Sequence, residues 1–292
     1  MRKVKIAAVQ MSCQGTVEEN INRADTFVRE AARDGAQIIL LPELFETRYF
    51  CQERNYDYYG LATSVDENPA VLHFQKVCKE LKVAIPVSFY EKSGNTTFNT
   101  IAMIDADGTV LGTYRKTHIP DDHYYQEKFY FSPGDTGFKV WDTAYARVGV
   151  GICWDQWFPE SARSMALLGA EILMYPTAIG SEPILECDSM PHWRRVMQGH
   201  AGANLMPLVA ANRIGTEVVT ANDENGGQNS SLTFYGSSFI ADETGDLVAQ
   251  ADRVTEGFIA YETDLDEVKE KRISWGIFRD RRPEHYGAIL GM

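Results

Sequence analysis

The chain has 292 residues, 44% of them hydrophobic, and its 41 acidic and 28 basic side chains give a net charge of −13. This size permits a large buried core in one domain. The negative charge disfavours nucleic acid and anionic membrane surfaces as partners and mildly favours cationic ligands. Five cysteines without a Cys-x-x-Cys pair are typical of a reducing compartment. The N-terminal apolar run is too short for a signal peptide, and no run approaches the roughly 20 apolar residues of a membrane span, so we expect a cytoplasmic protein.

Helix and strand patterns alternate along the chain without a linker, a repeat or a low-complexity segment. Thr16 to Glu19 has the spacing of a capping box, and apolar residues follow on one helical face, as they do again in "NPAVLHFQKVCKEL". Strand-like runs are "AQIILLPELF", "VAIPVSFYE", "FNTIAMID", "GTVLGTYRK", "RVGVGI", "EILMYP", "LVAANRIG" and "SSFIADETGDLVAQ", the last expected to be a hairpin. The alternation favours a single α/β domain over residues 1–292, with "TANDENGGQNSSLTF" as an exposed polar loop.

Cys153 is the best candidate for a nucleophile. It lies between the strand pattern that ends at Ile152 and a helix start at Pro159 and Glu160. A thiol at such a turn is held by rigid backbone, near amide groups that can bind an oxyanion and lower the thiol pKa. The alternative is a small buried hydrophobic residue, since free cysteines are commonly buried in this way.

Two charged residues occupy comparable positions. Glu43 ends the apolar run "AQIILLPE", and Lys116 follows "GTVLGTYR". A carboxylate, an ammonium and a thiol would then lie just past strand ends, where open α/β sheets gather their ligands. Each of these charges, taken alone, is more simply a solvated loop residue.

Together these segments resemble the nitrilase superfamily of carbon–nitrogen hydrolases. The matching blocks are "LLPELFE", "YRKTHIP" and "GVGICWDQWFPE", and a fourth family position, a second glutamate, falls on Glu127. The resemblance covers essentially the whole chain. It implies an α/β fold of four layers, an α-β-β-α sandwich with two mixed sheets face to face and helices outside. It also implies a homo-oligomer built from dimers, with residues 273–292 as a candidate for subunit contacts.

The chemistry of a thiol amidase assigns a role to each of these residues. A thiol that attacks an amide or urea needs a base to take its proton, and the leaving amine needs that proton back. Glu43 is assigned to both proton transfers. Lys116 and the backbone N–H of Trp154 are assigned to the oxyanion. By the resemblance, Glu127 would hold Lys116 charged and oriented and position the hydrolytic water. The alternative for Glu127 is a structural ion-pair partner.

The residues that follow Cys153 bear on the substrate. Asp155, Gln156 and Trp157 include no arginine, so a substrate carboxylate would lack a bidentate partner there. Glu182, in a loop after "EILMYP", would suit a cation at the far end of the pocket, and Asp122 and Asp155 are the next candidates. The remaining residues assigned to substrate binding are Tyr49, Tyr125 and Trp154.

The pair "CWDQWFPE" and "IGSEP" resembles family members that hydrolyse N-carbamoylputrescine. This resemblance implies a small cationic carbamoyl-amine as substrate, converted to putrescine, carbon dioxide and ammonia through a carbamoyl thioester on Cys153, in polyamine biosynthesis. The alternatives are a hydrolase of the β-ureidopropionase or nitrilase type and, in a different class, a catalytically silent binding protein. Retention of the four residues Glu43, Lys116, Glu127 and Cys153 argues against the silent protein.

Other chemistries have weaker support. A cysteine–histidine protease would need a histidine oriented toward Cys153, and we expect His192 and His200 to belong to the surface and packing of a helix instead. No Cys and His residues have zinc-site spacing, so we expect no metal site. The family resemblance implies no organic cofactor. The aromatic segment "RYFCQERNYDYYG" is expected to line a pocket or a subunit contact, because its charge does not suit a phosphate backbone.

Overall fold

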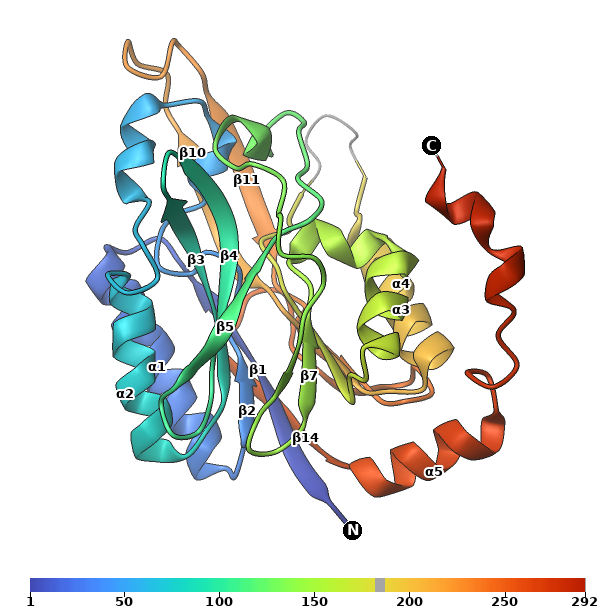
Figure 1. Ribbon diagram of the computed structural model, residues 1–292. Coiled ribbons are helices and arrows are strands. Elements are labelled where there is room, and N and C mark those ends of the chain that lie inside the picture. Colours follow the sequence, from blue (N-terminus) through green and yellow to red (C-terminus); the bar gives the residue numbers. More distant parts are fainter. Residues whose placement is uncertain (182–186, 292) are drawn as a thin grey trace.

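The computed structural model describes residues 1–181 and 187–291 of the chain. Two β-sheets lie face to face at its centre, and helices cover the outer face of each sheet (Figure 1). The predicted four-layer α-β-β-α sandwich is therefore confirmed. The layers arise because successive side chains of a strand point to opposite faces of its sheet.

The first sheet is built around β1, Lys3–Ser12, which is buried along most of its length. β1 pairs antiparallel with β14 and parallel with β2 and β10, and β10 pairs antiparallel with β11. The antiparallel strands β3, β4 and β5 adjoin β2 through a parallel bridge between Ile38 and Ala84. The bounds are Ile38–Leu40 for β2, Ile85–Ser93 for β3, Thr96–Ile104 for β4, Val110–Arg115 for β5, Arg213–Val219 for β10, Ser230–Tyr235 for β11 and Gly257–Asp264 for β14.

The second sheet has the strand order β13-β12-β9-β8-β7-β6. Its strands β7, β8 and β9 are parallel, and β6, β12 and β13 are added antiparallel. The bounds are Val140–Asp142 for β6, Arg147–Val150 for β7, Ile172–Pro176 for β8, Leu208–Ala211 for β9, Phe239–Ala241 for β12 and Leu247–Gln250 for β13. The hairpin predicted for residues 237–250 is confirmed as β12 and β13.

Helices α1 and α2 cover the first sheet, and α3 and α4 cover the second (Figure 1). The bounds are Val17–Arg33 for α1, Pro69–Leu81 for α2, Pro159–Leu167 for α3, Met190–Asn204 for α4 and Leu265–Trp275 for α5. The predicted capping box begins α1: Thr16 Oγ1 accepts a hydrogen bond from the Glu19 N–H, and the Glu19 carboxylate accepts one from the Thr16 N–H. The helix start predicted at Pro159 is also confirmed.

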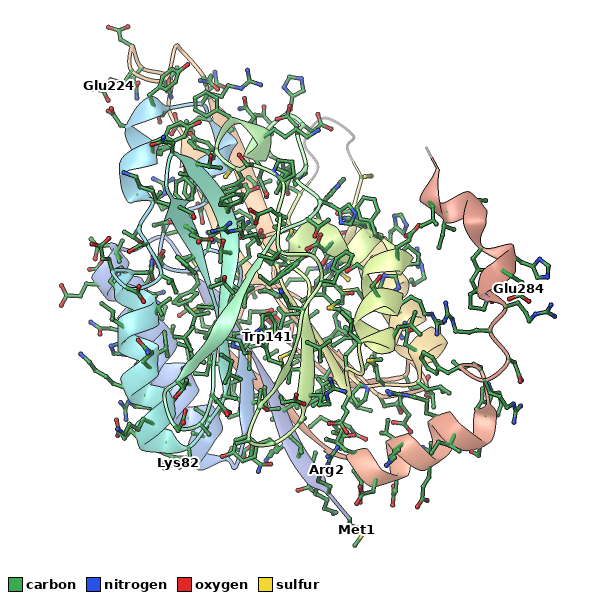
Figure 2. All side chains as sticks on the ribbon, viewed as in Figure 1. Met1, Arg2, Lys82, Trp141, Glu224 and Glu284 are labelled. Atoms are coloured by element: carbon green, nitrogen blue, oxygen red, sulfur yellow. The ribbon has the colours of Figure 1, made fainter. Side chains whose placement is uncertain are left out.

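Apolar side chains from both sheets fill the space between them (Figure 2). In β8, Ile172 and Met174 point into this inner layer, whereas Leu173 and Tyr175 pack against α3 and α4. β8 is therefore buried on both faces, which explains why its sequence is continuously apolar. The parallel strand β7, which leads to Cys153, lies beside β8 in the same interior.

One predicted strand-like run, "LVAANRIG", is divided in the structure. Residues 208–211 belong to the second sheet as β9, and residues 213–219 belong to the first sheet as β10. Asn212 supports the crossing, because its Nδ2 donates to the carbonyls of Ile179 and Gly236 and its Oδ1 accepts from the N–H groups of Ile179 and Arg213. The sequence pattern does not show this division, because nothing in the run "LVAANRIG" tells which of the two sheets each half will join.

The outer segments are short turns and loops. Of the exposed loop predicted at residues 220–234, residues 220–229 are mostly exposed, with Glu224 at the outer tip (Figure 2), whereas residues 230–234 belong to strand β11. After α5 the chain passes outside the second helical layer, where Arg163 of α3 lies 5.0 Å from the Phe278 ring centroid. Within the described ranges, no helix is long and apolar enough to cross a membrane. The 3-10 turns are η1 Phe50–Gln52, η2 Tyr56–Leu61, η3 Glu127–Phe129, η4 Cys153–Trp157, η5 Pro283–His285 and η6 Gly287–Leu290.

Candidate active site

A buried cluster of charges lies where strands β2 and β5 end. Glu43 follows β2, Lys116 directly follows β5, and Glu127 begins η3. Lys116 Nζ lies 2.9 Å from Glu43 Oε1 and 2.6 Å from Glu127 Oε2. All three side chains are at most 1% exposed. Lys116 therefore bridges two carboxylates in a site without bulk water.

The neighbouring charges keep this ammonium protonated. Burial alone would lower the pKa of Lys116, but the charges of Glu127 and Glu43 outweigh burial and raise that pKa well above its ordinary value. Burial raises the pKa of Glu127 to about 7, against the opposing effect of Lys116. Glu127 Oε1 also accepts a hydrogen bond of 2.7 Å from the Tyr49 hydroxyl. The cluster is thus closed by hydrogen bonds on the Glu127 side.

The Glu43 carboxylate has two unlike oxygens. Oε1 accepts hydrogen bonds from Lys116 Nζ and, at 2.7 Å, from Asn99 Nδ2. Oε2 is buried and has no hydrogen-bond partner among the residues that the structure describes. Most buried polar atoms in proteins are paired, so an unpaired one requires an explanation. An oxygen with unused lone pairs in this position can accept a proton from a reacting group.

Cys153 occupies a strained turn between β7 and α3. Its φ of +41° lies in the left-handed region, which a residue with a side chain rarely adopts. Gly151 precedes the turn, and a Cβ there would lie 2.7 Å from the Tyr175 ring, so the close approach requires glycine. The backbone of Ala178 hydrogen-bonds the Cys153 sulfur. The strain and the close packing hold the thiol in one position.

The thiol is protonated at neutral pH. Burial raises the pKa of Cys153 well above its ordinary value, the charge of Glu43 raises it further, and Lys116 lowers it. The backbone of Ala178 does lower this pKa, as expected of a nearby amide, but burial outweighs it and the net change in the pKa is upward. Attack by Cys153 therefore requires a base, and Glu43 is close enough for its charge to act on the thiol.

A cavity of about 470 Å³ opens onto Cys153. Its wall carries three carboxylates and several aromatic rings, and none of its described lining residues is lysine or arginine. The wall is therefore negatively charged and aromatic, which suits a cation. The charged and aromatic lining residues are Asp121, Asp122, Glu127, Tyr125, Trp154, Trp157 and His192.

The residues that the sequence assigns to substrate binding separate into three groups. Trp154 and Tyr125 line the cavity. Tyr49 does not, because it is buried behind Glu127 and directs its hydroxyl to that carboxylate. The expectation that Tyr49 contacts the substrate is therefore wrong. Glu182 lies outside the described residues.

Asp155 is fully buried and supports the turn at Cys153. Its Oδ2 accepts hydrogen bonds from the Ile152 N–H at 2.9 Å and the Tyr114 hydroxyl at 2.7 Å, and its Oδ1 accepts one from the His118 N–H at 3.0 Å. His118 Nδ1 lies 2.7 Å from the same Oδ1. The hypothesis that Asp155 binds a substrate cation is therefore wrong. Asp155 joins the Cys153 turn to the loop after Lys116, whereas Asp122 lies on the cavity wall.

The two histidines of α4 differ in position. His200 is buried, with Nε2 2.7 Å from the Gln156 carbonyl oxygen, and burial lowers its pKa. This agrees with the packing role expected for it. His192 lies on the cavity wall, and its ring centroid is 4.9 Å from that of Trp157. Sequence reasoning missed this second position, because helical spacing does not tell which face meets a cavity.

Sequence reasoning also missed the polar residues that support Glu43. Asn99 lies inside β4 and donates to the carboxylate, Ser88 Oγ accepts from the Leu44 N–H, and Arg213 donates to the Glu43 carbonyl. The available signal was a polar residue inside a buried apolar run, as in "FNTIAMID". Among the described residues, no group of three or more His, Cys, Asp and Glu side chains could hold a metal ion.

Comparison with known proteins agrees with this geometry. The sequence model of the carbon-nitrogen hydrolase family matches residues 5–273. The chain is 57% identical over 289 residues to an N-carbamoylputrescine amidase of Oryza sativa subsp. japonica, covering 99% of the chain and 95% of that protein. It is 53% identical over 291 residues to a citrullinase of Francisella tularensis subsp. tularensis, covering 99% of each. The crystal structure of a carbon-nitrogen hydrolase from Helicobacter pylori G27 matches with a TM-score of 0.90 at 33% identity, over 99% of both chains.

The chain therefore belongs to the carbon-nitrogen hydrolase family of the nitrilase superfamily. The resemblance drawn from "LLPELFE", "YRKTHIP" and "GVGICWDQWFPE" is confirmed. Members of this family hydrolyse carbon–nitrogen bonds, which agrees with a buried thiol beside a carboxylate and an ammonium.

The contacts of Asp155 lead to a first prediction. Asp155→Asn removes a buried charge and turns one acceptor into a donor that faces other donors, so we expect the free energy of unfolding to fall by about 2 to 4 kcal/mol. Activity should fall as well, because the Ile152 N–H next to the candidate nucleophile Cys153 loses its acceptor. Urea unfolding and steady-state kinetics measure the two effects. Asp107→Asn, at an exposed turn, is the control, and an equal loss in both variants would contradict the assignment.

Proposed function

We propose that the chain hydrolyses N-carbamoylputrescine to putrescine, carbon dioxide and ammonia through a carbamoyl thioester on Cys153. The observation that carries the proposal is the cavity at Cys153, whose described wall combines carboxylates and aromatic rings without a cationic side chain. Such a wall attracts the ammonium at the far end of this substrate by charge and by cation–π contact. The identity of 57% to an N-carbamoylputrescine amidase supports the same substrate.

The first half-reaction forms the thioester. The Cys153 thiol gives its proton to Glu43 Oε2, and the sulfur bonds to the urea carbonyl carbon. The bond from that carbon to the putrescine nitrogen then breaks, and Glu43 returns the proton to the departing amine. Putrescine leaves, and the carbamoyl group stays on Cys153.

The oxyanion formed in this step needs fixed donors. Lys116 has three N–H bonds, two of which go to Glu43 and Glu127, so the third is available to the oxyanion. The backbone N–H of Trp154, next to the nucleophile, is the second donor. Removal of one oxyanion donor costs roughly 3 to 4 kcal/mol of transition-state stabilisation in other enzymes.

The second half-reaction releases the carbamoyl group. Glu43 takes a proton from water, the water oxygen bonds to the thioester carbon, and the carbon–sulfur bond breaks with return of the proton to the sulfur. The resulting carbamic acid decomposes to carbon dioxide and ammonia. Glu127 keeps Lys116 charged and in place, and its position on the cavity wall allows it to orient the water.

Hydrolysis of L-citrulline is the second candidate, favoured by the identity of 53% to a citrullinase. The urea chemistry would be the same. Citrulline differs because its far end carries a carboxylate beside the ammonium, and the described wall has no arginine or lysine to pair with it. N-carbamoyl-β-alanine, a substrate of the β-ureidopropionase type, meets the same obstacle. The cavity therefore favours N-carbamoylputrescine.

The proposal also covers the self-association of the chain and its location in the cell. Residues 273–291 follow the compact part of the single domain and expose apolar side chains: Ile273, Trp275, Ile289 and Leu290 are 61 to 90% exposed. Exposed apolar patches mark protein contacts, so we infer that copies of the chain associate as dimers through this segment. All five cysteines are free thiols, which supports a location in the reducing cytoplasm.

The proposed nucleophile leads to a second prediction. Cys153→Ala should abolish ammonia release and leave the thermal unfolding transition in place. Intact-protein mass spectrometry of the wild type, quenched during turnover, should show a carbamoyl-sized adduct that maps to Cys153. Cys187→Ala, which removes the other thiol on the cavity wall, should keep near-normal activity. Full activity of Cys153→Ala would reject the mechanism.

A third prediction concerns the ammonium of the substrate. At an effective dielectric constant of about 20, a contact near 4 Å provides about 4 kcal/mol of attraction before desolvation. N-carbamoylputrescine should therefore exceed N-pentylurea, an uncharged analogue of similar length, in kcat/KM by roughly tenfold to a hundredfold, or about 1.4 to 2.8 kcal/mol. The kcat/KM for N-carbamoylputrescine should also exceed the values for L-citrulline and N-carbamoyl-β-alanine. Ammonia release is the assay for all of these substrates.

The acidic residues that bind the substrate ammonium can be identified by comparing N-carbamoylputrescine with N-pentylurea in variants of the enzyme. Glu182→Gln, Asp121→Asn and Asp122→Asn are compared with Asp107→Asn, which makes the same change in net charge at a distant turn. At least one of the first three variants should shrink the preference for N-carbamoylputrescine over N-pentylurea, and Asp107→Asn should not. A wild type that prefers L-citrulline would favour the second candidate.

A further inference from the structure

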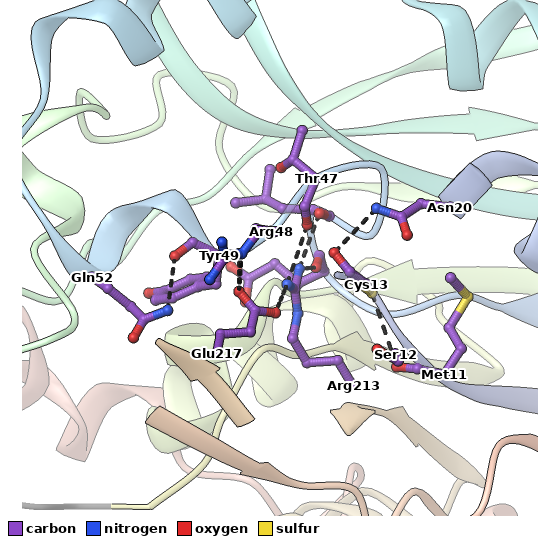
Figure 3. A network of polar contacts seen from close by, with 12 residues as sticks. Met11, Ser12, Cys13, Asn20, Thr47, Arg48, Tyr49, Gln52, Arg213 and Glu217 are labelled. Carbon is purple, nitrogen blue, oxygen red and sulfur yellow. Dashed lines mark hydrogen bonds and ion pairs between the residues drawn. The ribbon is translucent and has the colours of Figure 1, made fainter. Parts of the chain in front are cut away.

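A second buried ion pair lies beside the charge cluster, where the chain crosses from the second sheet to the first. Arg213 and Glu217 both belong to β10, and Arg213 Nη1 lies 3.1 Å from Glu217 Oε1. Both side chains are fully buried. Figure 3 shows the pair within a wider network of polar contacts that includes Thr47, Arg48 and Tyr49. Neither residue is part of the cavity wall at Cys153, so neither meets the substrate there.

Arg213 binds the backbone that carries Glu43. Its Nη2 donates to the carbonyl oxygens of Glu43 at 2.7 Å and Leu44 at 3.0 Å, and its Nη1 donates to that of Thr47 at 3.2 Å. Leu44 has a φ of +47°, a strained value for a residue with a side chain. Three carbonyls of one loop thus converge on the fixed plane of one guanidinium. This arrangement sets the direction in which the Glu43 side chain leaves the backbone.

Glu217 connects the pair to the other carboxylate. Its Oε2 accepts a hydrogen bond of 2.7 Å from the Tyr49 N–H, and the Tyr49 hydroxyl donates to Glu127 Oε1 at 2.7 Å. Glu127 Oε2 in turn contacts Lys116 Nζ. Arg213 is therefore connected to Glu127 through Glu217 and Tyr49, with the Tyr49 side chain joining the hydrogen bond at its backbone to the one at its hydroxyl.

Packing alone does not account for this pair. Two charges lose their hydration in the interior, and apolar residues of similar volume commonly fill such a space with equal or greater stability. The contacts of the pair supply a reason for its presence, since they end on the Glu43 loop and on Tyr49. Arg213 also lies over the rings of Tyr49 and Phe234, at 5.8 and 5.2 Å from the centroids, so its own position is fixed.

We propose that Arg213 and Glu217 are positioning residues that set the placement of the Glu43 and Glu127 carboxylates on either side of Lys116. Arg213 acts on Glu43 through the loop carbonyls, and Glu217 acts on Glu127 through Tyr49. The pair therefore controls proton transfer from Cys153 and the rate of the chemical step, and it leaves substrate binding unchanged. The inference rests on the proposed function for its assay substrate.

The first test is Arg213→Lys, which keeps the charge but loses the planar set of donors. A misplacement of about 1 Å at a reacting group costs on the order of a hundredfold in rate. We expect kcat for N-carbamoylputrescine to fall tenfold to a hundredfold while KM stays within twofold. The control is Arg272→Lys, because Arg272 also donates to backbone carbonyls, those of Leu205 and Ala170, away from the cavity.

The control separates positioning from stability. Arg272→Lys should lower the unfolding temperature and keep kcat within twofold of the wild type, measured per folded enzyme. An Arg213→Lys enzyme with normal kcat, or an equal loss of kcat in both variants, would overturn the proposal.

A double-mutant cycle tests the connection from Glu217 through Tyr49 to Glu127. It tests the positioning role of the ion pair even if Arg213→Lys does not fold. Glu217→Gln and Tyr49→Phe should each lower kcat, and the double variant should be no slower than the slower single variant, because both act on Glu127. Losses that multiply in the double variant would overturn the assignment of Glu217.

Alkylation of Cys153 by iodoacetamide, followed by mass spectrometry, makes the test independent of the substrate. Alkylation needs the same transfer of the thiol proton to Glu43, so its rate should fall with kcat in Arg213→Lys and stay normal in Arg272→Lys. A wild type inactive on N-carbamoylputrescine would reject the proposed function, and the alkylation rates would still decide the positioning role. Equal alkylation rates in wild type and Arg213→Lys would overturn it.

Discussion

The ammonium of Lys116, enclosed between Glu43 and Glu127, is the interaction on which the rest of the structure depends. A buried charge must be paired and hydrogen-bonded, and here contacts of 2.9 and 2.6 Å meet that requirement. Each carboxylate then needs support of its own, from Asn99 and from Tyr49. What remains unused is one oxygen of Glu43 and one N–H of Lys116, and these are the groups that the proposed chemistry employs.

The two sheets bring these groups together because their strands end at one place. The same region holds two strained residues, Leu44 next to Glu43 and Cys153 itself, both at positive φ. Each strained turn is held by a buried charge that contacts backbone groups: Arg213 binds the carbonyls at Leu44, and Asp155 accepts from the Ile152 N–H. Strain near the reacting groups is therefore maintained by polar interactions that packing alone could not supply.

Much of this could be predicted from the sequence, because strand ends and their polar residues are local patterns. The elbow at Cys153, the capping box at Thr16 and the four layers follow from such patterns and from the family resemblance. The roles of Asp155 and Tyr49 could not, since both depend on which distant side chains they meet in the folded chain. The raised pKa of Cys153 is likewise a property of the surrounding burial, and the crossing at Asn212 depends on which sheet each half of the run joins in the folded chain.

The central claim is that Glu43 is the base and acid of both half-reactions. Glu43→Gln keeps the size of the side chain and removes its ability to take a proton. Quenched-flow measurement of putrescine and ammonia release would give the rates of thioester formation and hydrolysis separately. Both rates should fall by roughly a hundredfold or more, the typical contribution of general acid–base catalysis. A Glu43→Gln enzyme that forms and hydrolyses the thioester at near-normal rates would contradict the account.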